Sequence, residues 1–251
     1  MAKIPVGVQL YSIRDDCKKD LAAAMAAVAK LGYHGVEYAG YYGKSGKELR
    51  KIQDGLGLKC CGTHTGMDTL LGDNFMKTVE FNKELGNPYL IVPWLPPEQR
   101  KTLAVWKETA MKFNELAAKA KAVGMRVGYH NHHEEFHAVE GEVLWEALYK
   151  NTTPDVIMQF DTGNARIGGA DPLPFLQRHK GRSVTVHLKP WSSKNETATI
   201  GEDELPWKDI FEACEHGGGT EWYIVEHESD PVSPINAIKK CLEGLKQMGK
   251  L

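Results

Sequence analysis

The sequence lacks the features that mark several large classes of protein. Its 251 residues include five cysteines, an odd number, and none of them forms a Cys-x-x-Cys pair. We therefore expect neither a disulfide framework nor a structural zinc cluster, and we interpret the cysteines as core residues in a reducing compartment. The formal net charge is −2, which provides no general electrostatic attraction to nucleic acid or to anionic membranes.

Signals for membrane insertion and export are also missing. No run of apolar residues approaches the roughly 20 that a transmembrane helix needs. The first residues, MAKIPVGVQLYS, lack the apolar stretch of a signal peptide. We expect a cytoplasmic protein, although a chain trimmed of an export leader would look the same. The sequence leaves the oligomeric state open, including a homo-oligomer.

What the sequence does contain is a regular alternation of short apolar runs and longer helical stretches. In the first helical stretch, Leu21, Met25 and Val28 recur at helical spacing, Asp15 or Asp16 is the expected N-cap, and Gly32 follows the last turn. The expected strands are Val6–Tyr11, Gly35–Tyr38, Lys59–Gly62, Tyr89–Pro93, Arg126–Asn131, Val156–Asp161, Ser183–Leu188 and Trp222–Glu226.

This alternation predicts an α/β fold with a parallel sheet covered by helices. Eight units favour a closed (β/α)8 TIM barrel that forms a single domain over residues 1–251, a length typical of that fold. No Gly-x-Gly-x-x-Gly motif follows the first strand, which removes the usual signal of a dinucleotide-binding sheet. An open sheet is the alternative.

Polar residues stand where the later strands end. Active sites of such barrels lie at the C-terminal ends of the strands, and a buried charge there is costly unless it is paired or bound to metal. The ends of strands five to eight carry carboxylates and imidazoles, at His130, His132, Glu135, Asp161, His187, Glu226 and Glu228. These side chains would converge on one point. The mixed oxygen and nitrogen set suits one divalent ion, Mn²⁺, Co²⁺, Zn²⁺ or Mg²⁺.

Each residue also has a simpler interpretation. Asp161 could cap the next helix, Glu226 could pair with a basic residue, and His187 could be a hydrogen-bonded core histidine. By itself, His64 is a structural residue or a substrate contact, and Lys189 is equally well a solvated lysine. The constellation is far more specific than any one member.

Motifs from the first predicted strand to the last resemble those of a known family. The motifs that carry the resemblance are VGVQLYSIRDD, LGYHGVEYAG, GTHTGM, VGYHNHHEEF, QFDTGNA, VHLKP, GEDELPW and YIVEHE. The chain resembles the xylose-isomerase-like TIM barrel superfamily over essentially its whole length. That group includes sugar phosphate isomerases and epimerases, inosose dehydratases and apurinic endonucleases. The resemblance implies one catalytic metal held by Glu, Asp, His and Glu from strands five to eight. Asp161, His187 and Glu226 match the last three.

The strand-five position departs from this pattern. Where many relatives have Glu-Asn-His, this chain has His130-Asn131-His132. Either His130 takes the ligand place, or Glu135 folds back from the following loop. We expect Glu135, because hard divalent ions favour oxygen ligands. The YHNHxxEF form also resembles the branch with inosose-dehydratase-like and 3-keto-glycoside-processing enzymes.

The resemblance implies a small carbohydrate substrate and proton abstraction next to a carbonyl, through a metal-stabilised enediolate. His132 is the leading candidate for the base, followed by Glu228 and His130. Lys189 and His64 would orient sugar oxygens. The residues expected to wall the pocket are Tyr11, Trp94, Phe136 and Trp191.

An isomerase or epimerase is the expected activity, and the alternative is a lyase or dehydratase acting on a keto-sugar, inosose or 3-keto-glycoside. Both begin with the same enediolate. A non-catalytic sugar-binding barrel and an apurinic endonuclease are minor alternatives. The weak net charge of −2 argues against the nuclease, which needs a basic surface for DNA.

Overall fold

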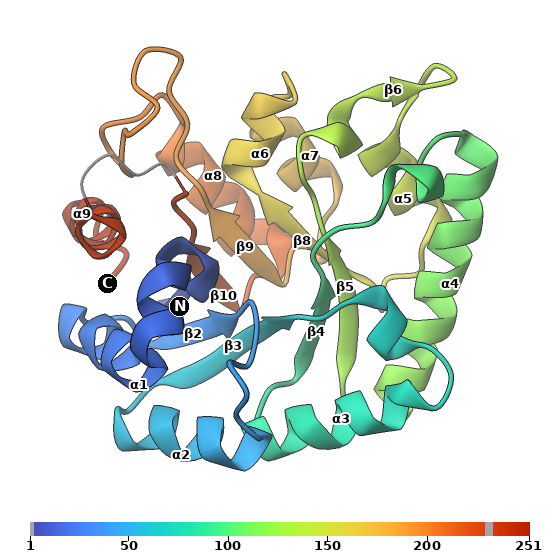
Figure 1. The fold of residues 1–251 in the computed structure, drawn as a ribbon. Helices are drawn as coiled ribbons and strands as arrows, with labels where there is room; N and C mark the ends of the chain where they lie inside the picture. The colour runs from blue at the N-terminus through green and yellow to red at the C-terminus, as the bar shows by residue number, and fades with distance from the viewer. Residues whose placement is uncertain (1–2, 229–232) are drawn as a thin grey trace.

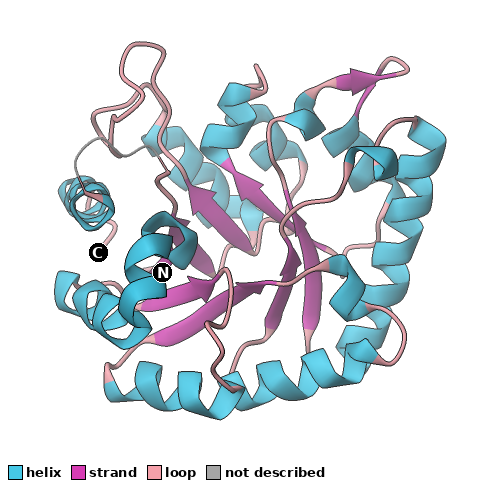
Figure 2. Cartoon of the chain, viewed as in Figure 1, coloured by secondary structure: helices cyan, strands magenta, loops and turns pink. Residues whose placement is uncertain are grey.

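The computed structural model describes residues 3–228 and 233–251. Eight parallel strands close into a barrel in the order β1-β10-β9-β8-β5-β4-β3-β2, surrounded by helices (Figures 1 and 2). The barrel strands are β1 (Val6–Gln9), β2 (Gly35–Tyr38), β3 (Lys59–His64), β4 (Tyr89–Val92), β5 (Arg126–His130), β8 (Ile157–Asp161), β9 (Thr185–Leu188) and β10 (Trp222–Val225). The predicted TIM barrel is therefore confirmed, and each predicted strand overlaps an observed one.

The helices form an outer ring because each has one apolar face toward the sheet. They are α1 (Arg14–Leu31), α2 (Gly46–Gly55), α3 (Asn74–Leu85), α4 (Leu103–Ala122), α5 (Leu144–Asn151), α6 (Thr162–Ile167), α7 (Pro172–Arg178), α8 (Trp207–Ala213) and α9 (Pro234–Gln247). In α4, for example, the buried Trp106, Ala110 and Phe113 recur at helical spacing. The Trp106 ring lies 5.7 Å from that of Tyr129 in β5. No helix in the described ranges is long and apolar enough to cross a membrane.

The structure agrees with some of the helix ends predicted from the sequence and differs from others. Gly32 and Gly86 have φ of 104° and 81° and end α1 and α3, as glycine can without strain. The expected N-cap at Asp15 or Asp16 is wrong, because α1 begins at Arg14 and both residues lie in its first turn. Asp20 instead interrupts α1 with φ −157° and ψ 101°, and its side chain accepts a hydrogen bond from the Ala23 N–H at 3.0 Å.

Two features outside the alternating pattern lie near the barrel mouth. A short hairpin, β6 (Ala138–Val139) and β7 (Glu142–Val143), follows β5. The pairing of β2 with β3 is irregular, because Val36 pairs with Cys60 while Glu37 pairs with Gly62. Such a bulge changes the direction of side chains and is common beside active sites. Here the extra residue is Cys61 of β3, and it sets Gly62 opposite Glu37 of β2.

Candidate metal centre

Four side chains meet at the C-terminal ends of neighbouring strands. His130, Asp161 and His187 belong to β5, β8 and β9, and Glu226 directly follows β10. One ligand atom from each residue lies within 4.8 Å of the others. All four are buried, with Glu226 the most exposed at 4%. The structure thus brings three predicted ligands together, with His130 as the fourth member.

Asp161 uses its two oxygens differently. Oδ1 accepts a hydrogen bond of 2.7 Å from the Asn164 N–H and so caps α6. Oδ2 is buried without a hydrogen bond partner, and the Nδ1 atom of His187 lies 3.8 Å away. Burial raises the pKa of Asp161 to about 7. An unsatisfied buried oxygen is unfavourable by about 1–3 kcal/mol, which a bound cation would relieve.

His187 lies between two carboxylates. Its Nδ1 is 2.8 Å from Oε2 of Glu226, and its Nε2 is 2.6 Å from Oε2 of Glu37. Although burial opposes protonation, Glu37 and Glu226 raise the pKa of His187 to about 10. Burial also disfavours the charge of Glu226, but Lys189 and His187 hold the pKa of that carboxyl well below its usual range.

The orientation of His130 is determined by Gln159. The Nε2 amide of Gln159 donates to Oε1 of Glu37 at 2.9 Å, so its Oε1 is the atom 3.0 Å from Nδ1 of His130. Because an amide oxygen only accepts, Nδ1 of His130 carries the hydrogen and Nε2 keeps its lone pair. Burial, followed by the neighbouring His187, holds the pKa of His130 well below its ordinary value.

Glu135, the residue expected to act as the strand-five ligand, lies outside this group of four. Its fully buried carboxylate accepts hydrogen bonds from Arg100 at 3.0 Å, from the Tyr129 hydroxyl at 2.9 Å and from the His132 backbone N–H at 2.8 Å. These contacts occupy both oxygens. In this arrangement Glu135 holds the turn that carries His132.

A cavity of about 300 Å³ opens in front of the cluster. It is lined by Tyr11, Ala39, His64, Pro93, Trp94, His130, His132, Glu226 and Glu228. Tyr11 and Trp94 are 43% and 48% exposed. Nδ1 of His132 is buried and has no hydrogen bond partner among the described residues. Burial lowers the pKa of His132 to about 4, so its imidazole is neutral near pH 7.

Three other residues were expected at the substrate pocket, and they lie in different places. Lys189 lies beside the cluster, where its ammonium contacts Asn164 at 3.1 Å, Glu226 at 3.3 Å and Glu228. Trp191 is not among the described residues that line the cavity. The Arg166 guanidinium lies 4.6 Å from the centre of its ring. Phe136 is buried in the core, with its ring 5.7 Å from that of Phe160.

A second cavity, of about 280 Å³, meets the first at His64. It is formed by the segments after β2 and β3 and by one face of α3, including Tyr41, Thr69, Lys77 and Phe81. The rings of Tyr41 and Phe81 lie 4.2 Å apart. The mouth therefore has room beyond the four clustered residues for a second part of a ligand.

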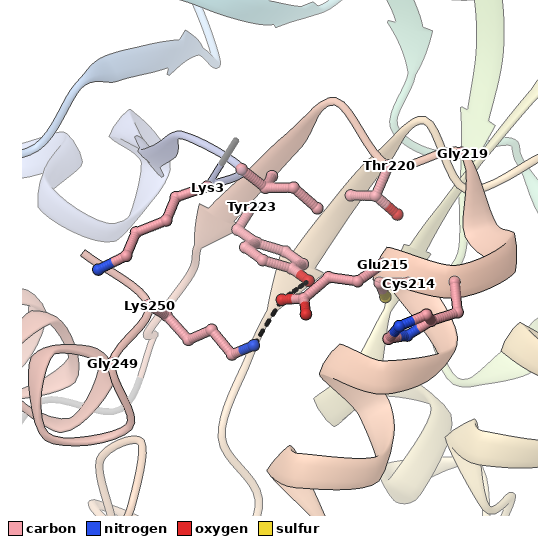
Figure 3. Close-up of a pocket in the computed structure, with 10 residues that line it drawn as sticks. Lys3, Cys214, Glu215, Gly219, Thr220, Tyr223, Gly249 and Lys250 are labelled. Carbon is pink, nitrogen blue, oxygen red and sulfur yellow. Dashed lines mark hydrogen bonds and ion pairs between the residues drawn. The ribbon is translucent and has the colours of Figure 1, made fainter. Parts of the chain in front are cut away.

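A larger cavity, of about 460 Å³, lies at the opposite end of the barrel, where β1 and β10 begin. Figure 3 shows its lining, with Glu215 in contact with both Lys250 and the Tyr223 hydroxyl. The ligand-type cluster and its unpaired carboxylate oxygen are absent from this lining. Volume alone does not identify the functional end.

The donor set at the mouth fits a divalent ion. Two imidazoles and two carboxylates offer the nitrogen and oxygen ligands that Mn²⁺, Co²⁺ or Zn²⁺ accept, and one buried oxygen of Asp161 has no hydrogen bond partner in the part of the chain that the structure describes. Sequence reasoning assigned no role to Gln159, Glu37 or Arg100, although these residues orient the others. For Gln159 a signal existed, because it precedes Asp161 by two residues and shares its strand face.

Comparison with solved structures agrees with the fold. A crystal structure of a sugar phosphate isomerase/epimerase from Parabacteroides distasonis ATCC 8503 has a TM-score of 0.84 and 26% identity, covering 97% of this chain and 98% of that one. A structure of L-ribulose 3-epimerase has a TM-score of 0.71 and 16% identity, covering 100% and 96%. At that lower identity the likeness shows the fold alone.

Curated relatives named inosose dehydratase are also similar. The protein from Lacticaseibacillus casei is 30% identical over 162 residues, which are 57% of this chain and 53% of the relative. The protein from Geobacillus kaustophilus (strain HTA426) is 28% identical over 192 residues, 66% and 60% of the two chains. The matches thus span little more than half the length of these relatives. The family model described as xylose isomerase-like TIM barrel matches residues 25–248, and the chain belongs to that family.

Proposed function

We propose that this protein is a divalent-metal-dependent enzyme that removes a proton next to the carbonyl of a small keto-sugar or inosose. The observation that carries the proposal is the buried group of His130, Asp161, His187 and Glu226, in which one carboxylate oxygen has no hydrogen bond partner. Lys189 and His187 compensate the charge of Glu226, but the free oxygen of Asp161 lacks a hydrogen bond to the described residues, which is unfavourable by about 1–3 kcal/mol and which a bound cation would relieve. The cavity in front of it is open to a ligand of sugar size.

His130 is the proposed strand-five ligand. Its Nε2 lone pair is free because Gln159 binds the other ring nitrogen, whereas Arg100 and Tyr129 occupy the carboxylate of Glu135. When bound, the cation would stabilise the negative charge that develops on a substrate oxygen as the proton leaves.

The proton would be taken by His132. Its ring lines the cavity, and its Nδ1 has no hydrogen bond partner among the described residues. Glu135 supports this role because it holds the backbone N–H of His132 at 2.8 Å. Lys189 and Glu228 contact each other beside Glu226, and this pair is the proposed proton donor to a departing oxygen.

Elimination is the proposed outcome, which makes the protein a lyase of the dehydratase type. Two observations favour it over isomerisation. The curated relatives are named inosose dehydratase, and the cavity that adjoins at His64 offers space for a departing group. Isomerisation or epimerisation is the second candidate, favoured by the Parabacteroides structure described as a sugar phosphate isomerase/epimerase.

The test is to incubate Mn²⁺-loaded protein in D₂O with ketoses, inososes and 3-keto-glycosides, and to follow the products by NMR. Deuterium next to the carbonyl together with expulsion of water or an aglycone supports the lyase. Deuterium without loss of a group supports the isomerase or epimerase. Absence of exchange across the panel, with Mn²⁺ bound, would favour a non-catalytic sugar-binding barrel and contradict the proposal.

The ligand assignment has its own test. We expect His130→Ala to weaken Mn²⁺ binding more than 100-fold, the upper value for changes in residues that only contact ligands. Glu135→Gln should retain most of the metal affinity. If Glu135→Gln weakened Mn²⁺ binding strongly and His130→Ala did not, Glu135 would be the ligand and His130 would not.

A further inference from the structure

The buried carboxylate of Glu37 belongs to neither the ligand group nor the cavity wall, yet it contacts the ligand group directly. Its carboxylate Oε2 lies 2.6 Å from Nε2 of His187, on the side of the ring away from Glu226. We propose that Glu37 is a positioning residue, which holds the hydrogen on Nε2 of His187 so that Nδ1 faces the metal. This inference rests on the proposed function, because it concerns the same metal.

The contacts of Glu37 show why a carboxylate is needed there. The Gln9 amide donates to Oε2 at 2.8 Å, and the Gln159 amide donates to Oε1 at 2.9 Å. With Nε2 of His187, and with Nε2 of His64 3.3 Å from Oε2, four nitrogen atoms therefore surround a carboxylate that only accepts. An amide at this position would direct an NH₂ group at one of these donors.

The backbone is shaped to admit this carboxylate. The irregular pairing of β2 with β3 falls between Val36 and Glu37 and sets Glu37 opposite Gly62. A Cβ at Gly62 would overlap Oε1 of Glu37 and lie 3.1 Å from its Cδ. The carboxylate could not easily move aside, because Gln9 and Gln159 hold it in place. Bulge and glycine together keep the space that Glu37 fills.

The same arrangement reaches the second histidine of the group. Gln159 donates to Glu37 and accepts from Nδ1 of His130. The Glu37 carboxylate thus fixes the direction of the Gln159 amide, which in turn leaves Nε2 of His130 free. One buried acid determines which nitrogen each of the two imidazoles presents. Residues that orient metal-binding histidines typically change metal affinity 10–100-fold when they are replaced.

The experiment compares the wild type with Glu37→Gln. We expect the variant to bind Mn²⁺ 10–100-fold more weakly, measured by electron paramagnetic resonance of free Mn²⁺. The second readout is ¹⁵N NMR of histidine side chains in the Zn²⁺-loaded proteins. In the wild type, His187 should show hydrogen on Nε2 and zinc on Nδ1, and the variant should lose this single form. A merely structural role would alter stability without changing the ring nitrogen that binds zinc.

Gly62→Ala provides a second variant, which replaces no polar residue. Its added methyl should displace the Glu37 carboxylate and reproduce the weaker Mn²⁺ binding. Cys60→Ala is the matched control, since Cys60 is a buried residue of the same strand that is two positions away. It should lower the melting temperature but leave the Mn²⁺ affinity unchanged.

Two outcomes would overturn the inference, and they are distinguishable. Failure of the wild type to bind any divalent ion would refute the proposed function and this inference with it. Normal Mn²⁺ affinity and unchanged His187 signals in a folded Glu37→Gln protein would refute the positioning role alone. Weaker binding in both Glu37→Gln and Gly62→Ala, with Cys60→Ala unaffected, supports it.

Discussion

The two ends of the barrel differ in how their charges are satisfied. At the N-terminal end, the cavity of about 460 Å³ has Glu215 in contact with Lys250 and the Tyr223 hydroxyl (Figure 3). At the mouth, the cavity is smaller, about 300 Å³, but Asp161 and His132 each keep a buried atom without a hydrogen bond partner among the described residues. Unsatisfied buried atoms, rather than volume, therefore distinguish the end suited to chemistry.

The largest effect should come from Asp161→Asn. The amide keeps the cap of α6, because asparagine is an equally good N-cap, but it removes the unpaired oxygen. Mn²⁺ affinity should fall more than 100-fold and turnover should be lost, while the metal-free protein should be as stable as the wild type or more so. Titration with Mn²⁺ and thermal unfolding measure both effects.

Asp171→Asn is the matched control for this change. Asp171 caps α7 through the Leu173 N–H at 3.0 Å, as Asp161 caps α6, but it belongs to no metal-type cluster in the described ranges. Its Mn²⁺ affinity should equal that of the wild type. Equal losses of Mn²⁺ affinity in Asp161→Asn and Asp171→Asn would mean that Asp161 acts only as a helix cap.

His132→Gln should affect proton transfer without affecting metal binding. Loss of a positioned general base lowers the rate by about 10²–10⁴-fold, and we expect that decrease in the rate of deuterium exchange from D₂O. The Mn²⁺ affinity should remain within about twofold. A normal exchange rate in this variant would transfer the role of base to Glu228.

A divalent ion bound at the barrel mouth should raise the free energy of unfolding of the whole protein. At a concentration 100 times its Kd, a ligand adds about 2.7 kcal/mol to the free energy of unfolding, which for a chain of this size raises the melting temperature by roughly 5–10 °C. Excess EDTA should reverse the increase. The same increase in Asp161→Asn would mean that the metal binds elsewhere.

The smallest effect is expected at the opposite end. Glu215→Gln weakens a partly exposed ion pair with Lys250, and such pairs contribute about 0–1 kcal/mol. The melting temperature should fall by no more than about 4 °C, with Mn²⁺ affinity and exchange rate unchanged. A clear loss of metal binding would remove the distinction between the two ends.

The sequence predicts the barrel well, because hydrophobic runs and the glycines that end helices are local signals. It also places Asp161, His187 and Glu226 at neighbouring strand ends, where the structure brings them together. The sequence does not decide whether His130 or Glu135 is the strand-five ligand. Arg100, which engages Glu135, is 35 positions away in the chain, and only the fold shows that this carboxylate is already occupied.

The role of Glu37 was hidden for a related reason. The residue was visible at the end of a strand, but the space for its carboxylate depends on a shift in register that sets Gly62 of β3 opposite it. Nearly all residues of β2 and β3 are buried on both faces of the sheet, so their sequences show no apolar–polar alternation that an extra residue would interrupt. Likewise, the break in α1 at Asp20 interrupts a stretch whose composition reads as one continuous helix.

The junction of β8 and α6 restricts how this barrel can be altered. Strand β8 ends at Asp161 and α6 begins at Thr162, so one carboxylate both starts a helix and faces the metal-type cluster. An insertion there would displace the helix cap and the proposed metal ligand together. Barrels of this kind diversify by exchanging the loops that follow their strands. Grafting of new specificity is better directed to the longer connection between β9 and α8 beyond Lys189, whose ammonium contacts Glu226 and Glu228.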